Sequence, residues 1–466
     1  MAVTAVHSPA EVELYEVRRA IYPRAVSGWF AGWRIALVAV TQLIYYGTAW
    51  LTWNGRQAVL FDLAARKFYI FGLVLWPQDF IFLTTLLVIS ALSLFLFTAL
   101  AGRLWCGYAC PQTVYTEIFM WIERAVEGDR MQRMKLDQQP SSARKLRLKS
   151  TKHALWIALA LWTGFTFVGY FTPIRTLAHE VAALALGPWE TFWILFYGFA
   201  TYGNAGWMRE QVCKYMCPYA RFQSVMFDSD TLVITYDVQR GEPRGSRSRS
   251  VDPRQAGLGD CVDCGICVQV CPTGIDIRQG LQYECIGCAA CIDGCDRVMD
   301  KMGYAKGLIR YSTENAVLGR YPDRDILRRL LRPRMLVYGA ILLAVVGVFS
   351  ALLYLRVPLK VDVLRDRATL TRETPDGLIE NVYRLQLMNT TERPREFMIS
   401  AGGIEGLRLV ASLPVTVPAA GTLTVPVALR VDPQAIAQGS HPVRFHVEDS
   451  ADPRVKADEK SVFYVR

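Results

Sequence analysis

All twelve cysteines of the chain stand in short, regularly spaced motifs, and eight of them form two matching runs. The first run is Cys261-x-x-Cys264-x-x-Cys267-x-x-x-Cys271-Pro272, and the second is Cys285-x-x-Cys288-x-x-Cys291-x-x-x-Cys295-Asp296. In this spacing three close thiolates hold one iron–sulfur cluster, and the fourth cysteine crosses to the other cluster. The sequence therefore predicts two 4Fe–4S clusters. Their ligands would be Cys261, Cys264, Cys267 and Cys295 for one cluster and Cys285, Cys288, Cys291 and Cys271 for the other.

A pair of zinc sites is the alternative interpretation of these two runs, because Cys-x-x-Cys is also a zinc-binding spacing. The doubled run of four and the proline after Cys271 favour iron–sulfur clusters. Gly265 and Gly287 provide the backbone freedom that such tight loops need. The second run ends in Cys295-Asp296 where ferredoxins usually have Cys-Pro, which bears on loop rigidity and potential rather than on ligation.

The other four cysteines form two Cys-x-x-x-Cys-Pro motifs, Cys106–Pro111 and Cys213–Pro218, each placed after an apolar segment. On one helix, positions i and i+4 share a face, so each pair could chelate a soft ion. The proline could also begin a new helix, with Cys110 or Cys217 near its N-terminus, where the helix dipole favours thiolate. Four such thiolates suit Cu(I), zinc or a further iron–sulfur cluster. The alternative is that these cysteines are small residues buried between helices, with no role in metal binding. The presence of two matching pairs favours a metal or redox role.

Long apolar segments must position these motifs, since 52% of the residues are hydrophobic and only 20% are charged. A membrane-spanning helix needs roughly 20 apolar residues. Five uncharged segments meet or approach this length, of which the fourth is shorter and more polar: Ile35–Trp53, Phe80–Gly102, Ala154–Ile174, Thr191–Met208 and Met335–Leu355. We therefore expect five crossings.

Lysine and arginine are distributed unevenly between the loops. Residues 103–152 carry ten and residues 209–334 carry nineteen, whereas 54–79 carry three and 175–190 carry one. Because cytoplasmic loops are enriched in positive charge, we expect the N-terminus and the ferredoxin runs to be cytoplasmic and residues 356–466 to be periplasmic. The charged stretch before the first span has no cleavage-site pattern, so no cleaved signal peptide is expected. The net charge of +10 then indicates contact with membrane lipid and no nucleic-acid partner.

After the last span the sequence changes to short β-branched stretches separated by Pro, Gly and Asp turns, such as Thr422–Val431, His441–Val447 and Ser461–Val465. This pattern predicts an immunoglobulin-like β-sandwich. It contains no cysteine, and we expect it to dock a partner rather than perform chemistry. The chain has no Gly-x-Gly-x-x-Gly fingerprint and no P-loop, so no nucleotide site is indicated.

The predicted fold is a multi-domain membrane protein. It combines an α-helical bundle of five transmembrane helices, a ferredoxin-like α+β module with two 4Fe–4S clusters, and a C-terminal all-β immunoglobulin-like sandwich. The predicted domains are an N-terminal cytoplasmic segment (1–34), a membrane domain with four helices and both Cys-x-x-x-Cys-Pro motifs (35–239), a basic linker (240–259), the ferredoxin module (260–312), the fifth helix (335–355) and the sandwich (358–466).

With its parts in this order, the chain resembles the cytochrome c oxidase accessory proteins of the CcoG family, also called FixG or RdxA. The resemblance covers nearly the whole chain and rests on the five apolar segments, the two Cys-x-x-x-Cys-Pro motifs, the two ferredoxin runs and the outer β-domain. It implies a multi-pass protein of the bacterial inner membrane that reduces Cu(II) to Cu(I) for assembly of cbb-type cytochrome c oxidase. Copper, as substrate or bound ion, would lie at the catalytic cysteines Cys106, Cys110, Cys213 and Cys217.

The resemblance further implies partners: subunits of the oxidase or copper chaperones, and an unidentified electron donor that is either a cytoplasmic protein or the quinol pool. Two other functions stay open. The paired Cys-x-x-x-Cys-Pro motifs are also similar to those of membrane polyferredoxins that serve nitrate and nitrous-oxide reductases, which would make the chain an electron relay to a periplasmic reductase or its maturation system. A non-enzymatic scaffold for oxidase assembly is the third possibility.

Overall fold

The computed structural model describes residues 20–252, 255, 257–329, 331–366 and 371–466. Much of the predicted N-terminal segment and part of the basic linker, at 253, 254 and 256, lie outside the described residues. The chain forms two compact units. Unit 1 comprises Met1–Thr41, Leu94–Ala160 and Phe199–Met335, and unit 2 comprises Gln42–Ser93, Leu161–Gly198 and Leu336–Arg466.

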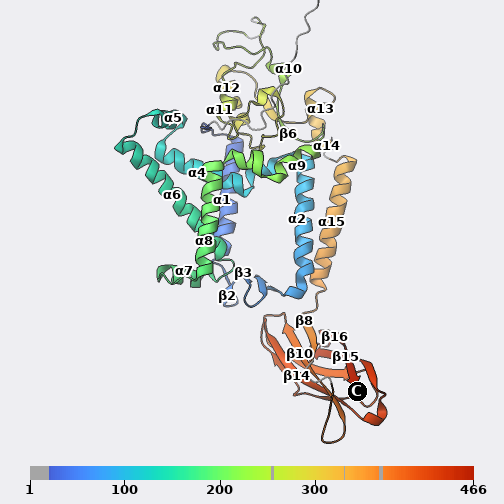
Figure 1. Cartoon of the computed structure of the whole chain (residues 1–466). Coiled ribbons are helices and arrows are strands. Elements are labelled where there is room, and N and C mark those ends of the chain that lie inside the picture. Colours follow the sequence, from blue (N-terminus) through green and yellow to red (C-terminus); the bar gives the residue numbers. More distant parts are fainter. Residues whose placement is uncertain (1–19, 253–254, 256, 330, 367–370) are drawn as a thin grey trace, which may run out of the picture. The chain divides into compact units, whose positions relative to one another are not determined.

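Five helices carry the chain from one unit to the other, because each unit boundary falls inside a helix. These helices, drawn in Figure 1, are α1 (Trp29–Thr48), α2 (Phe80–Ala101), α6 (Ala143–Val168), α8 (Pro188–Thr201) and α15 (Pro333–Tyr354). In the part of the chain that the structure describes, two helical segments are long and apolar enough to cross a membrane, Pro77–Ala101 and Pro333–Tyr354. The bundle of five transmembrane helices stays a prediction.

Two of the expected spans end earlier than the sequence suggested. Helix α1 stops at Thr48, and strand β1 (Thr52–Trp53) pairs with β2 (Arg56–Gln57) instead of extending the first span. The turn between them is Asn54-Gly55, both with positive φ, which is the residue pair that a two-residue hairpin prefers. Helix α6 ends at Val168, six residues before Ile174, the last residue of the third expected span.

Unit 1 contains the cysteine motifs, on short helices around a two-stranded antiparallel sheet in which Val233 is paired with Ser312 and Tyr236 with Ile309. Besides parts of the five helices above, its elements are α3 (Leu104–Tyr108), α4 (Pro111–Glu127), α5 (Arg130–Gln138), the π-helices η2 (Tyr202–Met208) and η3 (Val212–Met216), α9 (Pro218–Met226), β6 (Val233–Tyr236), α10 (Val238–Gly241), α11 (Ile266–Gln269), η4 (Ile277–Gln279), α12 (Ala290–Met302), β7 (Ile309–Ser312), α13 (Glu314–Val317), η5 (Asp323–Asp325) and α14 (Ile326–Arg329).

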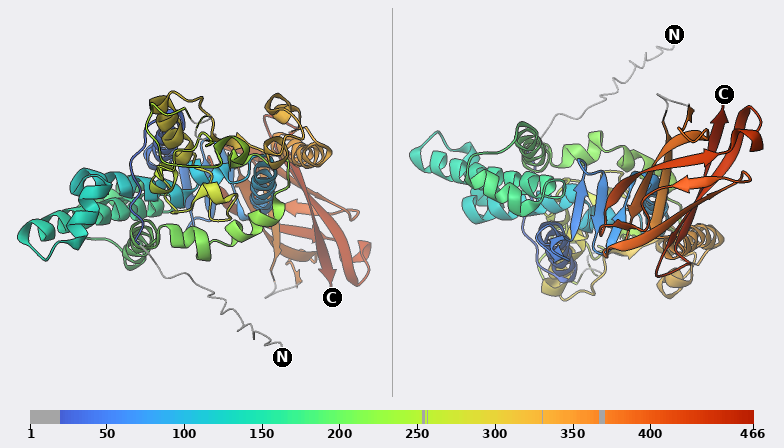
Figure 2. Two further views of the ribbon diagram at one scale, coloured as in Figure 1. Left: turned by 90° about the horizontal axis from the view of Figure 1, so that it is seen from above. Right: turned by 90° about the horizontal axis from the view of Figure 1, so that it is seen from below.

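Unit 2 contains the C-terminal β-sandwich, whose strands are the orange to red arrows in Figure 2. Its strands are β8 (Leu359–Arg365), β9 (Arg372–Glu373), β10 (Ile379–Asn389), β11 (Arg395–Gly402), β12 (Arg408–Val410), β13 (Val415–Val417), β14 (Thr422–Val431), β15 (Gly439–Asp449) and β16 (Lys456–Val465), with the 3₁₀-helix η6 (Pro433–Ala435). One sheet has the order β12-β14-β10-β8, with β9 also paired to β10, and the other has the order β13-β11-β15-β16; every pairing is antiparallel.

Alternate residues of β10 and β15 fill the space between the two sheets. Tyr383 of β10 and Phe445 of β15 are fully buried, and their rings lie 5.1 Å apart in an edge-to-face arrangement. Burial of large apolar side chains of this kind contributes about 1.5–3 kcal/mol each to folding. The predicted all-β C-terminal domain is confirmed.

A small antiparallel sheet that the sequence did not predict packs on this sandwich within unit 2. It consists of β3 (Val59–Asp62), β4 (Lys67–Ile70) and β5 (Leu73–Leu75), followed by the 3₁₀-helix η1 (Pro77–Asp79). Val74 and Trp76 are buried against Met388, and the buried Asp79 pairs with Arg356 and Lys360. The remaining element of this unit is α7 (Ile174–Ala182). Helices α2 and α15 also meet in this unit, through the rings of Phe82 and Phe349 at 6.0 Å.

Candidate functional site

The two ferredoxin runs of unit 1 have matching backbone geometry. Gly265, after the second cysteine of the first run, is left-handed with φ 62° and begins α11; Ala289, in the same place of the second run, is left-handed with φ 58° and begins α12. Each run therefore turns from loop to helix directly after its second cysteine, and its third cysteine lies in the first turn of the helix. The two runs therefore share one loop-to-helix geometry, as the repeated ferredoxin spacing leads us to expect.

The fourth cysteine of each run lies with the first three of the other run. Burial, and then the thiol of Cys267 with those of Cys264 and Cys261, raise the pKa of Cys295 to about 12. Burial, and then the thiols of Cys288, Cys285 and Cys271, raise the pKa of Cys291 well above its ordinary value. The thiols of each predicted set thus lie near enough to influence one another. The assignment of four ligands to each cluster stays a prediction.

The second set lines a cavity whose chemistry fits an iron–sulfur cluster. This cavity of about 330 Å³ is bounded by thiols and by apolar side chains: Cys267, Cys271, Cys285, Cys288, Cys291, Ile234, Ile275, Ile277, Ile286, Ala290 and Thr273. Four thiolates in an apolar enclosure are the donor set that a 4Fe–4S cluster takes, and such surroundings influence its potential. The residues present therefore fit the predicted group.

The Cys-x-x-x-Cys-Pro motifs each place a cysteine at the start of a helix. Cys110 precedes α4 with Pro111 as the first helical residue, and Cys217 precedes α9 with Pro218 in the same role. This part of the prediction is confirmed. The expectation that both cysteines of a motif share one helical face is wrong, because Cys110 (ψ 128°) and Cys217 (ψ 110°) are extended. Proline is the physical reason, since it excludes the preceding residue from helical geometry.

The four cysteines of the two motifs lie in one region of unit 1. The thiols of Cys110 and Cys217 both act electrostatically on Cys106, and all three of these thiols act on Cys213. Their convergence on one metal ion stays a prediction. Among the described residues, no three His, Cys, Asp or Glu side chains are arranged to hold a single metal ion.

Burial dominates the protonation of these thiols. It raises the pKa of Cys106 to about 11 and that of Cys213 to about 12, with smaller contributions from neighbouring cysteines. The pKa of Cys110 is also raised by burial, although the N–H groups of Gln112 and Thr113 at the start of α4 act in the opposite direction. The expected lowering by the helix dipole is therefore wrong for Cys110, because loss of hydration outweighs it.

The four-thiol site lies directly against the loop of the second ferredoxin run. A Cβ atom added to Gly107 would come within 2.8 Å of the carbonyl carbon and oxygen of Gly287 and 2.9 Å of the Cα of Cys288. In return, a Cβ added to Gly287 would lie 3.0 Å from the carbonyl oxygen of Arg103. The two backbones are therefore in contact, with Cys106 beside Gly107 on one side and Cys288 beside Gly287 on the other.

Two residues near the thiols were missed in the sequence. The buried amide of Gln223, on α9, lies 3.5 Å from Sγ of Cys106. The buried guanidinium of Arg103 donates to the carbonyl of Ala220, and its charge acts on Cys106, Cys213 and Cys285 alike. A cation near both groups of thiols favours their ionised forms. The sequence feature that could have identified Arg103 is its position three residues before Cys106.

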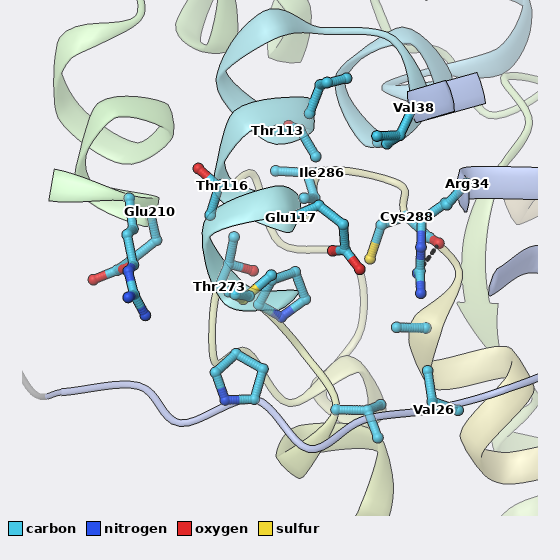
Figure 3. Close-up of a pocket in the computed structure, with 18 of the residues that line it drawn as sticks. Val26, Arg34, Val38, Thr113, Thr116, Glu117, Glu210, Thr273, Ile286 and Cys288 are labelled. Carbon is cyan, nitrogen blue, oxygen red and sulfur yellow. Dashed lines mark hydrogen bonds between the residues drawn. The ribbon is translucent and has the colours of Figure 1, made fainter. Parts of the chain in front are cut away.

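Helix α1 contacts the second run through two further residues that the sequence did not single out. The carboxylate of Asp293 accepts hydrogen bonds from the N–H groups of Phe30 and Ala31, at 3.2 and 2.7 Å, and so satisfies the first turn of α1. Nη1 of Arg34 donates to the carbonyl oxygen of Cys288 at 2.7 Å. In Figure 3 this guanidinium lies on one side of Cys288 and the carboxylate of Glu117, from α4, lies on the other.

Three parts of the chain match known domain families. Residues 208–314 match a 4Fe–4S dicluster domain, residues 83–127 match a 4Fe–4S binding domain, and residues 349–466 match the IG-like fold at the C-terminal of FixG. With the grouped thiols, these matches define the class: an iron–sulfur electron-transfer protein of ferredoxin type with a C-terminal immunoglobulin-like domain.

Relatives along nearly the whole chain identify the family. Protein RdxA of Cereibacter sphaeroides is 40% identical over 94% of this chain and 96% of its own, and protein RdxB of the same organism is 41% identical over 96% of both chains. Nitrogen fixation protein FixG of Rhizobium meliloti is 41% identical over 84% of this chain and 80% of its own. The chain belongs to the FixG/RdxA family. This membership and the two apolar helical segments indicate a membrane protein.

Proposed function

We propose that this iron–sulfur protein is a cupric reductase of the bacterial inner membrane that reduces Cu(II) to Cu(I) at Cys106, Cys110, Cys213 and Cys217. In this proposal the product supports copper insertion and assembly of a cbb-type cytochrome c oxidase. Its partners would be oxidase subunits or copper chaperones. The N-terminus and the ferredoxin runs would be cytoplasmic, and the C-terminal domain would be periplasmic.

The contact of Gly107 with Gly287 and Cys288 is the observation that carries the proposal, because it sets the four-thiol site beside the second set of cluster ligands. Bound to the two sets of cysteines, 4Fe–4S clusters supply single electrons. Reduction of Cu(II) to Cu(I) consumes one electron and no proton.

The thiols supply selectivity for the product, because soft sulfur ligands prefer Cu(I). The charge of Arg103 acts on two of the four thiols, Cys106 and Cys213, and favours their thiolate forms. The Gln223 amide donates a hydrogen bond to Sγ of Cys106 over 3.5 Å.

Anaerobic metal analysis with EPR tests the proposal on the purified full-length protein. We expect about eight irons, the content of two 4Fe–4S clusters, and loss of the Cu(II) signal when Cu(II) meets protein reduced by dithionite and freed of excess reductant. The variant with serine at all four positions should keep its iron and its reduced-cluster signals but leave the Cu(II) signal in place. The complementary variant Cys288→Ser should lose iron.

Each alternative function has its own outcome. An unchanged Cu(II) signal with intact, reducible clusters would contradict cupric reduction and leave an electron relay to a periplasmic reductase or its maturation system. For a scaffold, neither copper reduction nor electron relay would be needed for oxidase assembly. Deletion of residues 360–466 would abolish oxidase assembly by a scaffold, but should spare copper reduction in vitro by a reductase.

A further inference from the structure

A second cavity in unit 1, distinct from the cluster cavity, opens beside Cys288. Its volume of about 940 Å³ includes open space at its mouth. Its walls come from the segment before α1, from α1, from α3 and α4, and from the loops of both ferredoxin runs. Gly107 and Tyr108 of its wall stand just after Pro77–Ala101, one of the two helical segments that could cross a membrane.

The charged groups around this cavity disfavour a metal cation. Five arginines and two glutamates line it: Arg24, Arg34, Arg124, Arg133, Arg209, Glu117 and Glu210. Arg133 and Arg209 share the one carboxylate of Glu123, at 2.8 and 3.1 Å, and Arg34 donates to the carbonyl of Cys288, which carries no charge. The arginines therefore outnumber the carboxylates, which disfavours a copper cation. Their N–H groups can donate to the oxygen atoms of a ligand.

Glu210 is the most unusual group in the wall. Its side chain is buried, yet within the described part of the chain it forms no ion pair, and its hydrogen bond comes from the neighbouring Gln211 at 3.1 Å. Burial of a carboxylate without a cationic partner costs stability, which makes this residue a candidate for a functional role. It lies at the junction of the two π-helices η2 and η3, next to Arg209 with φ 41°, and such irregular helices are frequent at functional sites.

The cavity also adjoins the redox ligands. Cys288 and Ile286 of the second run line it, together with Pro272 and Thr273, which follow Cys271. In Figure 3 the carboxylate of Glu117 and the sulfur of Cys288 face each other, and Thr113 and Thr116 of α4 line the same wall. Apolar side chains such as Val26, Val38 and Val270 complete the enclosure. A ligand here would combine an apolar body with polar edges and would lie next to the electron acceptor.

We propose that this cavity binds a membrane quinol and is the site at which the protein receives its electrons. On oxidation the two O–H bonds of the quinol break. Its two protons pass to the Glu210 carboxylate and to solvent, its two electrons go one to each 4Fe–4S cluster, and quinone leaves. Cys213 of the proposed copper site also lines this cavity. The inference concerns the electron donor and the proposed function concerns copper, so quinone binding and copper reduction are measured separately.

The first test is binding of decylubiquinone to the anaerobic full-length protein in detergent, measured by titration of tryptophan fluorescence. Thr116→Phe, which fills the cavity from α4, and the isosteric Glu210→Gln are the test variants. Glu405→Gln, an exposed glutamate of the C-terminal domain, is the matched control. We expect saturable binding by wild type and control, and at least tenfold weaker binding by one or both cavity variants with unchanged iron content.

Reduction by decylubiquinol under anaerobic conditions is the second test, read as bleaching of cluster absorbance and as the reduced-cluster EPR signal. The Glu210→Gln variant should lose reduction by quinol at least tenfold while dithionite still reduces its clusters. Equal quinone binding and equal quinol reduction in all variants would overturn the proposal. So would saturable binding of inorganic phosphate that displaces decylubiquinone and is lost in the same variants, because the cavity would then be an anion site. Copper reduction by dithionite-reduced protein tests the proposed function separately.

Discussion

Nη1 of Arg34 donates a hydrogen bond to the carbonyl oxygen of Cys288 over 2.7 Å, although the two residues are 254 positions apart in the chain. The guanidinium is buried, and its charge acts on the Cys288 thiol. Helix α1 thus contributes a fixed cation beside the predicted ligands of the second run. Fixed charges near cluster ligands influence the reduction potential.

Replacement of Arg34 by glutamine should lower the potential of the cluster held by Cys288. A cation stabilises the more negative reduced state, and its loss at a partly buried site costs about 1–2 kcal/mol. For one electron about 1.4 kcal/mol corresponds to ~59 mV, so we expect a fall of about 40–90 mV in an EPR-monitored redox titration. Arg34→Lys keeps the charge and is the control. Equal potentials in the glutamine variant and the wild type would contradict this role.

Affinity for Cu(I) at the four-thiol site should rise with pH. The pKa of Cys106 is raised to about 11 and that of Cys213 to about 12 from an ordinary value of 9.0, so at neutral pH both thiols are protonated and must lose protons to bind copper. Each proton released adds ~tenfold in affinity per pH unit. Competition with a Cu(I) chelator between pH 6 and 8 measures the slope, and Cys213→Ser should reduce it by about one proton. A flat profile would show that copper binds elsewhere.

The same thiols affect the stability of the metal-free protein in the opposite sense. A raised pKa in the folded state means that folding favours the protonated thiol, so the contribution is complete below the ordinary value of 9.0. It is lost as the pH rises toward 11 and 12. Thermal unfolding of the copper-free protein should therefore show stability falling above pH 9, with a smaller fall in Cys213→Ser.

Local patterns in the sequence predicted the structural features that depend on residues close together in the chain. The ferredoxin spacing predicted which cysteines gather, because short loops limit where successive thiols can lie. Pro111 and Pro218 predicted the helix starts, since proline is favoured at the first helical position. The alternation in the stretch that forms β14 predicted the β-sandwich, because one face of each strand must be buried.

The features that the sequence did not predict depend on contacts between segments that are distant in the chain. The hydrogen bonds that Asp293 accepts from the start of α1 join residues more than 260 positions apart, and no local pattern marks them. The raised thiol pKa values follow from burial, which is a property of the packed structure rather than of the motif. The contact of Gly107 with Gly287 likewise appears only when α3 meets the second run.

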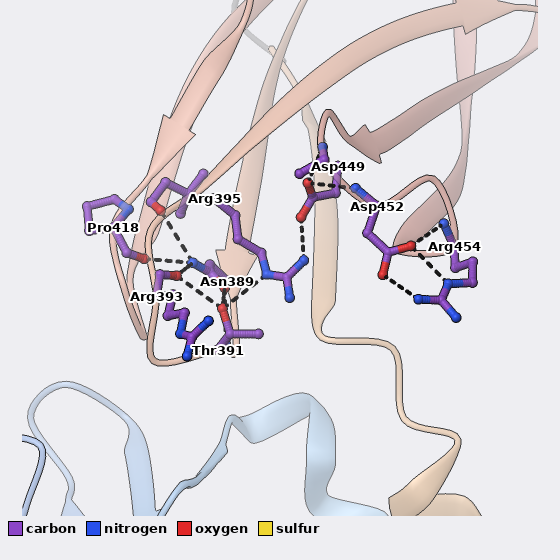
Figure 4. Close-up of polar contacts among 10 residues, drawn as sticks. Asn389, Thr391, Arg393, Arg395, Pro418, Asp449, Asp452 and Arg454 are labelled. Atoms are coloured by element: carbon purple, nitrogen blue, oxygen red, sulfur yellow. Dashed lines mark hydrogen bonds and ion pairs between the residues drawn. The ribbon is translucent and has the colours of Figure 1, made fainter.

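Asn389 should be among the most sensitive residues of the C-terminal domain (Figure 4). Its fully buried amide donates to the carbonyls of Arg393 and Pro418, at 2.7 and 3.1 Å, and accepts from the N–H and hydroxyl of Thr391. Alanine would leave several buried backbone groups without partners, at about 2–3 kcal/mol.

Hydrogen exchange of the full-length protein measures this effect as loss of amide protection in the segments 389–395 and 415–421. Arg454→Ala is the matched control in the same domain, because Arg454 forms an exposed pair with Asp452. Exposed pairs contribute little to stability, so protection should not change in the control. Unchanged protection in Asn389→Ala would mean that water replaces the amide.

Gly107→Ala should separate the four-thiol site from the second ferredoxin run. The added Cβ would lie 2.8 Å from the backbone of Gly287, which cannot rotate away as a side chain could, so one loop must move. Overpacking of this kind costs about 1–3 kcal/mol, and displacement of Cys106 from the loop of Cys288 should slow reduction of Cu(II) by pre-reduced protein. Stopped-flow loss of the Cu(II) signal measures the rate, with iron content as the check on intact clusters. Gly32→Ala in α1 is the control, since its Cβ would meet no atom within 4 Å. An equal rate in Gly107→Ala, with the expected loss of stability, would show that electrons reach copper by a route other than this contact.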